Sequence, residues 1–188
     1  MGYRDRQFSA APSPVKKALA ILVLALVCVP VSQGAAATHR ANEAGLPAHG
    51  VLTPGESLAG VRIGDTIAKV KRLWGANYKI CPDCNPRTWF YFYSRGEPLG
   101  AAVRFSNQGR VVAAFTLGAP TGWRTAEGLL VGEQIDKVVR LYGSLGWHGC
   151  IGYGAMTMRQ GNTVTSIYTT GQAVYGFAIT APAIPVCQ

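Results

Sequence analysis

Residues 60–75 read GVRIGDTIAKVKRLWG, and the same pattern returns at residues 128–143 as GLLVGEQIDKVVRLYG. Eight of the 16 positions are identical at an offset of 68, and most of the others are conservative replacements. A second match, GRVVAAFTL at 109–117 with GQAVYGFAI at 171–179 (offset 62), extends the similarity. Self-similarity at a nearly fixed spacing is the signature of a repeated supersecondary unit. We therefore expect two copies, repeat 1 at 57–118 and repeat 2 at 125–181.

Each copy predicts a short amphipathic helix. Asp65 and Thr66 stand where a helix N-terminus is capped, and Gly75 stands where a left-handed residue ends a helix. The second copy repeats the pattern in residues 135–143, with Glu133 in place of Asp65 giving a poorer cap. The apolar residues of the first copy fall on one helix face: Ile67, Val70, Leu73 and Trp74.

Strands are predicted after each helix, because runs rich in aromatic and β-branched residues alternate with turn residues. The expected strands are 88–94, 101–105 and 110–117 in repeat 1, and 155–159, 163–169 and 172–180 in repeat 2. A helix followed by antiparallel strands is an α+β layered architecture. A unit of about 60 residues is hard to stabilise alone, so we expect the two units to share one continuous sheet or core.

The N-terminal part predicts export. Residues 18–29 are apolar and uncharged, Lys16 and Lys17 precede them, and the small residues 35–37 follow. This order is that of a secretory signal peptide, here 1–37, cleaved near Ala37. An uncleaved anchor is the alternative, but the run is shorter than the roughly 20 apolar residues of a spanning helix. We expect a secreted or extracytoplasmic protein with a flexible lead-in at 38–56 and no later membrane span.

Four cysteines remain after cleavage: Cys81, Cys84, Cys150 and Cys187. An even number in an oxidising compartment predicts two disulfides, and three pairings are possible. We favour Cys81–Cys84 and Cys150–Cys187, the second tying the C-terminal tail at 182–188 to the body. Cys-Pro-Asp-Cys also has the spacing of thiol–disulfide exchange proteins, but such a pair is usually activated at a helix N-terminus. A zinc site would need two more ligands, and only His148 stands near Cys150.

Composition excludes several classes of protein. Hydrophobic residues make up 48% and charged residues 14%, which excludes a disordered polar chain. The net charge is +9, but the cations of the mature part form no stripe, so we expect no nucleic-acid partner. Within the repeats His148 is the one histidine, and no nucleophile elbow, zinc-protease helix or phosphate loop occurs. We expect no enzyme, no cofactor and no metal. The recurring cations are interpreted as solvated helix faces: Lys69, Arg72, Lys137 and Arg140.

The candidate binding residues begin with the aromatic strand at 89–93. Alternation places Trp89, Tyr91 and Tyr93 on one side and the two phenylalanines on the other. Phenylalanine suits a helix-packed core, whereas Trp and Tyr carry polar groups that suit a partly wet face or a protein partner. We interpret the first three as a recognition patch, with the alternative that all these aromatics cover core. Its proposed extension is Arg104, Arg159, Tyr168 and Tyr175.

The tandem pattern G-[V/L]-x-[I/V]-G-x-x-I-x-K-V-x-R-L-[W/Y]-G, followed by a strand meander, resembles the β-lactamase inhibitor protein (BLIP)-like superfamily. It also resembles the small outer-membrane lipoprotein domain of the bacterial barrel-assembly machinery. The resemblance implies that two units form one curved sheet whose concave aromatic face grips a protein partner. The cysteines at 81, 84 and 187 depart from the disulfide layout of the inhibitor.

These observations together predict an exported, non-enzymatic protein-binding or inhibitor-like module. It would be a monomer acting on an unidentified extracytoplasmic protein. The alternatives are a cell-envelope assembly or scaffold protein and a CxxC thiol–disulfide protein.

Overall fold

A computed structural model describes residues 46–91 and 100–188. Every described residue belongs to one compact unit. The expected signal peptide and Tyr93 of the expected patch therefore lie outside the described residues. Across 46–91 and 100–188, no helix has the length and apolar character needed to cross a membrane.

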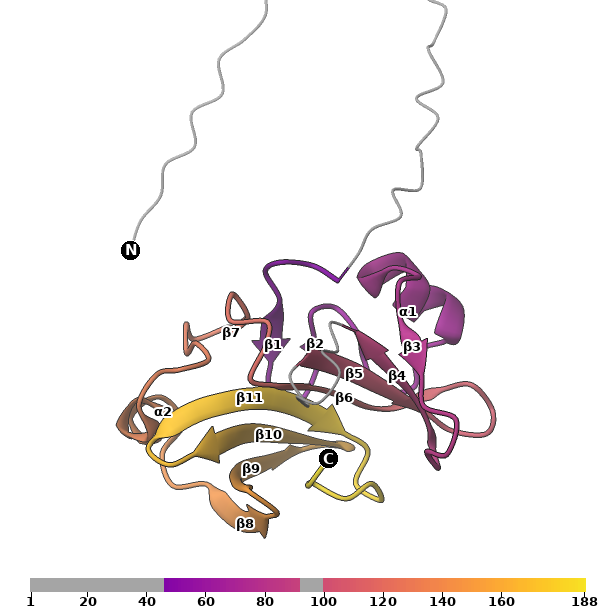
Figure 1. Ribbon diagram of the computed structural model, residues 1–188. Helices are drawn as coiled ribbons and strands as arrows, with labels where there is room; N and C mark the ends of the chain where they lie inside the picture. Colours follow the sequence, from indigo (N-terminus) through magenta and orange to yellow (C-terminus); the bar gives the residue numbers. More distant parts are fainter. Residues whose placement is uncertain (1–45, 92–99) are drawn as a thin grey trace, which may run out of the picture. The chain divides into compact units, whose positions relative to one another are not determined.

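The described part is a mixed α+β fold that is mostly sheet (Figure 1), so the α+β class expected from the sequence is confirmed. The helices are α1 (Ile67–Trp74) and α2 (Ile135–Tyr142). The strands are β1 (Val51–Thr53), β2 (Ser57–Leu58), β3 (Lys79–Ile80), β4 (Arg87–Tyr91), β5 (Gly100–Phe105), β6 (Val111–Leu117), β7 (Arg124–Thr125), β8 (Gly146–Cys150), β9 (Tyr153–Gln160), β10 (Thr163–Thr170) and β11 (Ala173–Thr180).

Eight of the eleven described strands form one antiparallel sheet, in the order β3-β4-β5-β6-β11-β10-β9-β8. The strands that follow α1 form one half, and those that follow α2 form the other. The halves join where β6 pairs with β11, through Phe115 with Ala178 and Ala113 with Thr180. A smaller sheet, β2-β1-β7, lies beside the large one and includes a parallel pairing of β1 with β7.

The two helices begin and end as expected, but the reason for the weaker second cap differs. The Thr66 hydroxyl accepts a hydrogen bond from the Lys69 backbone N–H at 3.3 Å, and Gly75 ends α1 with φ of 83°. Helix α2 follows Gln134, whose side chain makes no capping bond. Gln134 stands where Thr66 stands in the first stretch, and a short hydroxyl caps better than a long amide.

Asp65 and Glu133 make matching contacts before the two helices. Each carboxylate accepts the backbone N–H of the residue three positions earlier, at 2.9 and 2.8 Å. Each also pairs with the lysine four positions later, Lys69 at 2.9 Å and Lys137 at 2.7 Å. These lysines therefore support the helix starts in addition to facing solvent. The Lys137 ammonium, together with the backbone N–H, holds the pKa of Glu133 below its usual value.

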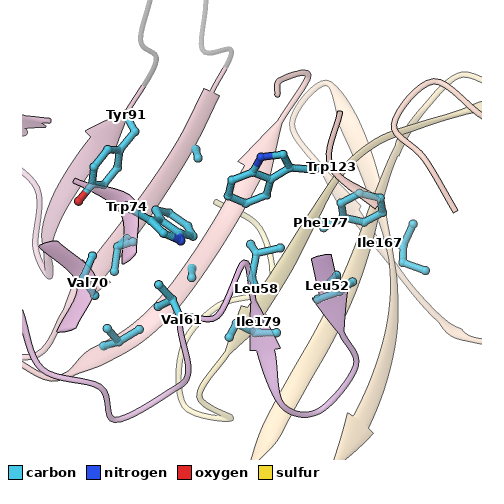
Figure 2. Packing of buried hydrophobic residues seen from close by; sticks show 14 of the residues in the cluster. Leu52, Leu58, Val61, Val70, Trp74, Tyr91, Trp123, Ile167, Phe177 and Ile179 are labelled. Atoms are coloured by element: carbon cyan, nitrogen blue, oxygen red, sulfur yellow. The ribbon is translucent and has the colours of Figure 1, made fainter. Parts of the chain in front are cut away.

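Both helices pack on the same face of the large sheet, which we call the helix face. At its centre the fully buried Trp74 ring lies between those of Tyr91 and Trp123 (Figure 2), with centroids 5.5 and 5.3 Å away. Its Nε1–H donates to the Ala59 carbonyl at 3.1 Å, so the indole is buried without an unpaired donor.

Several parts of the chain differ from the expectation, including the short strands β2, β3 and β7, which were not predicted. Residues 51–53, expected in a flexible lead-in, form β1, and Leu52 is fully buried in the core, so the lead-in interpretation is wrong there. Trp123 donates from Nε1 to the Pro47 carbonyl at 2.8 Å, which ties the preceding residues down as well. Strand β8, with sequence GWHGC, was not expected, because its two glycines lower its intrinsic strand propensity.

Candidate binding surface

The other face of the large sheet carries the candidate site. Direct cross-strand partners point to the same side, and one such row runs through Phe90, Ala102, Phe115, Ala178 and Ser166. We call this side the tail face, because the C-terminal segment 181–188 packs against it. Its apolar cluster is separate from the helix-face core. The buried members are Ala102, Phe115, Leu117, Ala155, Tyr168 and Ala178.

Trp89 and Tyr91 belong to the opposite, helix-covered face. They are 3% and 1% exposed, so their assignment to an exposed recognition patch is wrong. The Trp89 ring stacks on Tyr78 with centroids 3.7 Å apart. The Tyr91 hydroxyl lies 3.4 Å from the Gly75 carbonyl at the end of α1. Both rings therefore belong to the core, where the Tyr91 hydroxyl has a partner and the buried Trp89 Nε1–H has none. Burial, reinforced by Tyr78, raises the pKa of Tyr91.

The remaining four patch residues do share the tail face. Arg104 pairs with Ala113, which pairs with Thr180, and Arg159 lies two strands further along the same row. Arg159 is exposed and Tyr168 is fully buried. Tyr175 is half-buried against the tail-face cluster. The structure thus places two of the described patch residues on the helix face and four on the tail face.

The C-terminal segment turns back from β11 toward β9 and β10 (Figure 1). The Tyr168 hydroxyl donates to the Val186 carbonyl at 2.7 Å, and the Tyr153 hydroxyl donates to the Gln188 carbonyl at 2.8 Å. The Gln188 backbone N–H donates in return to the Tyr153 hydroxyl at 2.7 Å. The segment therefore holds both tyrosine rings in fixed positions, with their centroids 5.2 Å apart.

Both favoured disulfides are confirmed. Cys150–Cys187 joins the end of β8 to the C-terminal segment, and Cys81–Cys84 closes a short loop between β3 and β4. The second pair follows the C-terminal end of α1 and does not precede a helix, so it lacks the helix N-terminus that activates redox cysteines. In the part of the chain that the structure describes, no cluster of three metal-ligating side chains is present.

Arg104 is the unusual group of the tail face. Its guanidinium carbon lies over the Phe115 ring, 5.6 Å from the centroid. Its Nε atom is buried and has no hydrogen-bond partner. No acidic residue of 46–91 or 100–188 forms an ion pair with it. Burial lowers the pKa of Arg104, an effect that Tyr168 and Tyr153 partly oppose. This half-buried cation therefore lies on an aromatic ring and has no counter-charge among the residues that the structure describes.

Two hydroxyls on the same face also lack partners. The side-chain oxygens of Ser166 and Thr180 are buried and accept or donate no hydrogen bond, and both residues are fully buried. Native proteins leave few buried polar atoms unpaired. Among the described residues Trp89 Nε1, on the helix face, is also unpaired, so such atoms are not confined to the tail face. No sequence pattern distinguishes these two residues from other strand residues, and the sequence analysis did not include them.

Two shallow hollows lie elsewhere, on either side of the start of β1. Their volumes are about 330 and 450 Å³, and both are lined by His49, Gly50 and Val51. Neither lining includes an unpartnered buried polar atom. The tail face is therefore the stronger candidate for a binding site.

No family model and no curated protein matches this chain. Among solved structures, the chain is similar to a DUF4309 family protein from Bacillus subtilis, with 15% identity and a TM-score of 0.51. That match covers 68% of this chain and 88% of the other. An extracellular protein containing an SCP domain from Bacillus anthracis str. Ames matches with 11% identity and a TM-score of 0.44.

The second match covers 64% of this chain, which spans less than half (44%) of the Bacillus anthracis protein. At such identities the likeness to the Bacillus subtilis protein indicates a shared fold alone. Neither protein is described as a β-lactamase inhibitor or as a lipoprotein of the barrel-assembly machinery.

Proposed function

We propose that this chain is an exported, non-enzymatic module that binds another protein on its tail face. The observation that carries the proposal is Arg104, a half-buried guanidinium with an unpaired Nε–H and no ion-pair partner among residues 46–91 and 100–188. A buried donor left unpaired costs about 1–3 kcal/mol, more when the group is charged. A carboxylate of a partner, bound at the half-exposed part of the side chain, would instead supply a counter-charge for the guanidinium.

The surroundings of Arg104 favour a macromolecular partner. Arginine and tyrosine are enriched among the residues that dominate protein–protein binding energy. Tyr153 and Tyr175 are half-buried neighbours, with ring centroids 6.2 Å apart. Because the C-terminal segment fixes Tyr153 and Tyr168 beforehand, their ordering would cost little at the moment of binding.

Export is supported by two independent features. Two disulfides are typical of proteins that fold in an oxidising compartment. The apolar run at 18–29 with its preceding lysines has the order of a secretory signal. We therefore place the mature protein outside the cytoplasm as part of the proposal.

We further propose that the two halves are copies of one unit, as in the BLIP-like superfamily. In the first half the Gly64 N–H donates to the Val111 carbonyl, and the Val111 N–H donates to the Asp65 carbonyl. In the second half, the same two bonds join Val174 to the stretch that begins at Gly132. Gly132 and Glu133 correspond to Gly64 and Asp65 at an offset of 68, and Val174 corresponds to Val111 at an offset of 63.

The strand offset of 62 taken from the sequence is therefore one residue short. It aligns Phe115 with Phe177, which lie on opposite faces of the sheet. A shift by one residue moves a side chain to the other face, and an offset of 63 restores the match. Where β6 and β11 join, the Ala181 N–H donates to the Val112 carbonyl and the Gly118 N–H donates to the Tyr175 carbonyl. These two bonds are equivalent, because Ala181 corresponds to Gly118 and Tyr175 corresponds to Val112 at the offset of 63.

A capture experiment tests the proposed function. The disulfide-bonded protein is immobilised and exposed to the secreted and envelope proteins of its native cells. Two tail-face variants, Tyr175→Ala and Arg159→Glu, are compared with wild type and with Arg140→Ala on the exposed side of α2. Circular dichroism and melting curves establish that each variant is folded.

We expect a protein that wild type and Arg140→Ala retain and that both tail-face variants lose. If all four chains retain the same proteins, or if Arg140→Ala alone loses the partner, the tail face is not the binding surface.

A further inference from the structure

We infer that a second copy of this chain pairs with β8, the strand at one end of the large sheet (Figure 1), so that one sheet continues through both copies. In the described part of the chain, β8 pairs with β9 alone, and its other edge is open. This inference goes beyond the proposed function, because it concerns the edge of the sheet and not the tail face. It also replaces the monomer expected from the sequence.

The open edge of β8 carries backbone groups that point away from β9. A two-residue turn joins the two strands, so Cys150 and Tyr153 at its ends form a hydrogen-bonded pair. Because bonded and non-bonded pairs alternate along an antiparallel ladder, His148 also turns its N–H and C=O toward β9. Trp147 and Gly149 therefore direct theirs outward, where another strand can reach them.

The β8 edge lacks the features that normally keep sheet edges apart. Natural edge strands are often very short or carry lysine or proline. The other end of the sheet fits that description, because β3 has two residues and one of them is Lys79. Strand β8 has five residues, GWHGC, four of them exposed, with no proline, lysine, arginine or acid. Its Trp147 side chain is 62% exposed. Such an edge is a site for pairing with another strand.

The register of β8 favours a second copy as the occupant. If β8 pairs with itself about a two-fold axis at His148, Trp147 of each copy lies opposite Gly149 of the other. These are the residues with outward groups, so four N–H to C=O bonds form and each of these groups finds a partner. Moving the axis to Trp147 or to Gly149 places the other residue opposite a position outside β8. The strand is therefore complementary to itself in one register.

The side chains fit the same register. Trp147 lies on the helix face, since its cross-strand partner is Met156 of the helix-face core. Gly149 of the second copy adds no side chain that would crowd the ring, just as Gly154 leaves room for it within the chain. The two His148 side chains would lie next to each other beside the axis. Like charges directly opposite one another are destabilising, so a lysine at this position should prevent pairing.

One neighbouring atom does not close the edge. The Cys187 Sγ atom lies 3.7 Å from the Gly149 carbonyl, but in a disulfide it has no hydrogen to donate. The contact between two five-residue strands is small, and small interfaces form weak or transient complexes. We therefore expect association at high micromolar concentrations. Because directly opposed residues point to the same side, both tail faces would lie on one side of the dimer and could bind a repetitive partner together.

The test measures the mass and the amide exchange of the disulfide-bonded protein from micromolar to millimolar concentration. Sedimentation equilibrium gives the mass, and NMR hydrogen exchange reports single backbone amides in the wild-type chain. His148→Lys places like charges beside the axis, and His148→Thr changes the same position without a charge. The matched control Asn162→Lys adds the same charge in the exposed turn between β9 and β10. Melting curves establish that each variant is folded.

We expect wild type, His148→Thr and Asn162→Lys to approach the mass of a dimer at millimolar concentration, and His148→Lys to stay a monomer. In wild type, exchange of the Trp147 and Gly149 amides should slow at least twofold with concentration, and that of the His148 amide far less. This exchange decides the question even if His148→Lys fails to fold.

A monomer at every concentration, or a dimer that leaves exchange at Trp147 and Gly149 unchanged, would overturn the inference. A dimer that His148→Lys retains, or that Asn162→Lys also loses, would equally exclude pairing through β8. The capture experiment on the tail face is independent of these results, so the proposed function stands or fails separately.

Discussion

Breaking the Cys150–Cys187 disulfide should cost much more stability than breaking Cys81–Cys84. Both bonds are intact in the same chain, so each serves as the control for the other. The perturbation is a pair of double variants, Cys150→Ser with Cys187→Ser and Cys81→Ser with Cys84→Ser. Serine is close to cysteine in shape and cannot form the covalent link.

The expected magnitudes follow from the lengths of the two closed loops. A disulfide restricts the unfolded chain more strongly when it closes a longer loop. For a separation of 37 residues the loop-entropy relation gives about 3.8 kcal/mol, and for 3 residues about 1.6 kcal/mol. The first variant should also loosen the C-terminal segment, because that link anchors it beside Tyr153 and Tyr168.

Urea unfolding of the oxidised proteins measures the free energies, and ¹³C-labelled tyrosine spectra report the two rings. We expect the larger loss of stability, and altered Tyr153 and Tyr168 signals, only in the Cys150–Cys187 variant. If the two double variants lose equal stability, or if the short loop matters more, loop closure is not what these bonds contribute. Unchanged tyrosine spectra would mean that the hydrogen bonds hold the segment without the link.

Two further predictions concern single residues. Gly176→Ala should destabilise by about 1–3 kcal/mol or more, because a Cβ there would lie 2.0 Å from the backbone carbonyl of Thr116. In Gly154→Ala the added Cβ would lie at the same distance from the Trp147 ring, but that ring is 62% exposed and can rotate away. Thermal melting should therefore show a clearly smaller loss of stability than for Gly176→Ala, together with a change in tryptophan fluorescence. Folding lowers the pKa of Glu133, so the ionised carboxylate stabilises the folded state. This stabilisation is complete above the unfolded-state pKa near 4.5 and is lost as pH falls through the folded-state pKa. Urea titrations should therefore find Glu133→Gln slightly less stable than wild type at neutral pH, by about 1 kcal/mol or less, and equal to it in acid; a difference that persists in acid would contradict the assignment.

The helices could be read from the sequence because their signals are local. The 3.6-residue spacing of apolar side chains and the glycine at position 75 fix α1 within a few residues. The strands of the second half were similarly clear, since β10 and β11 begin and end within a residue of the expected ranges. Their signal is a run of β-branched residues between turns, and it does not depend on distant contacts.

The candidate site could be predicted only in part. Arg104 was included among the binding residues as an extension of an aromatic patch, but its unpaired Nε–H and its place over Phe115 depend on packing between strands. The hydroxyls of Ser166 and Thr180 carry no local signal, because a serine or threonine in a strand has a partner in most folds.

The sequence by itself determined the α+β class, the two helix starts and an even number of cysteines, and it left three disulfide pairings open. These follow from the spacing of residues along the chain. Only the tertiary structure decided which side of the sheet the helices cover. Period-two alternation divides a strand into two faces but does not say which is buried, and Trp89 and Tyr91 lie on the covered side because α1 and Tyr78 supply contacts from other parts of the chain.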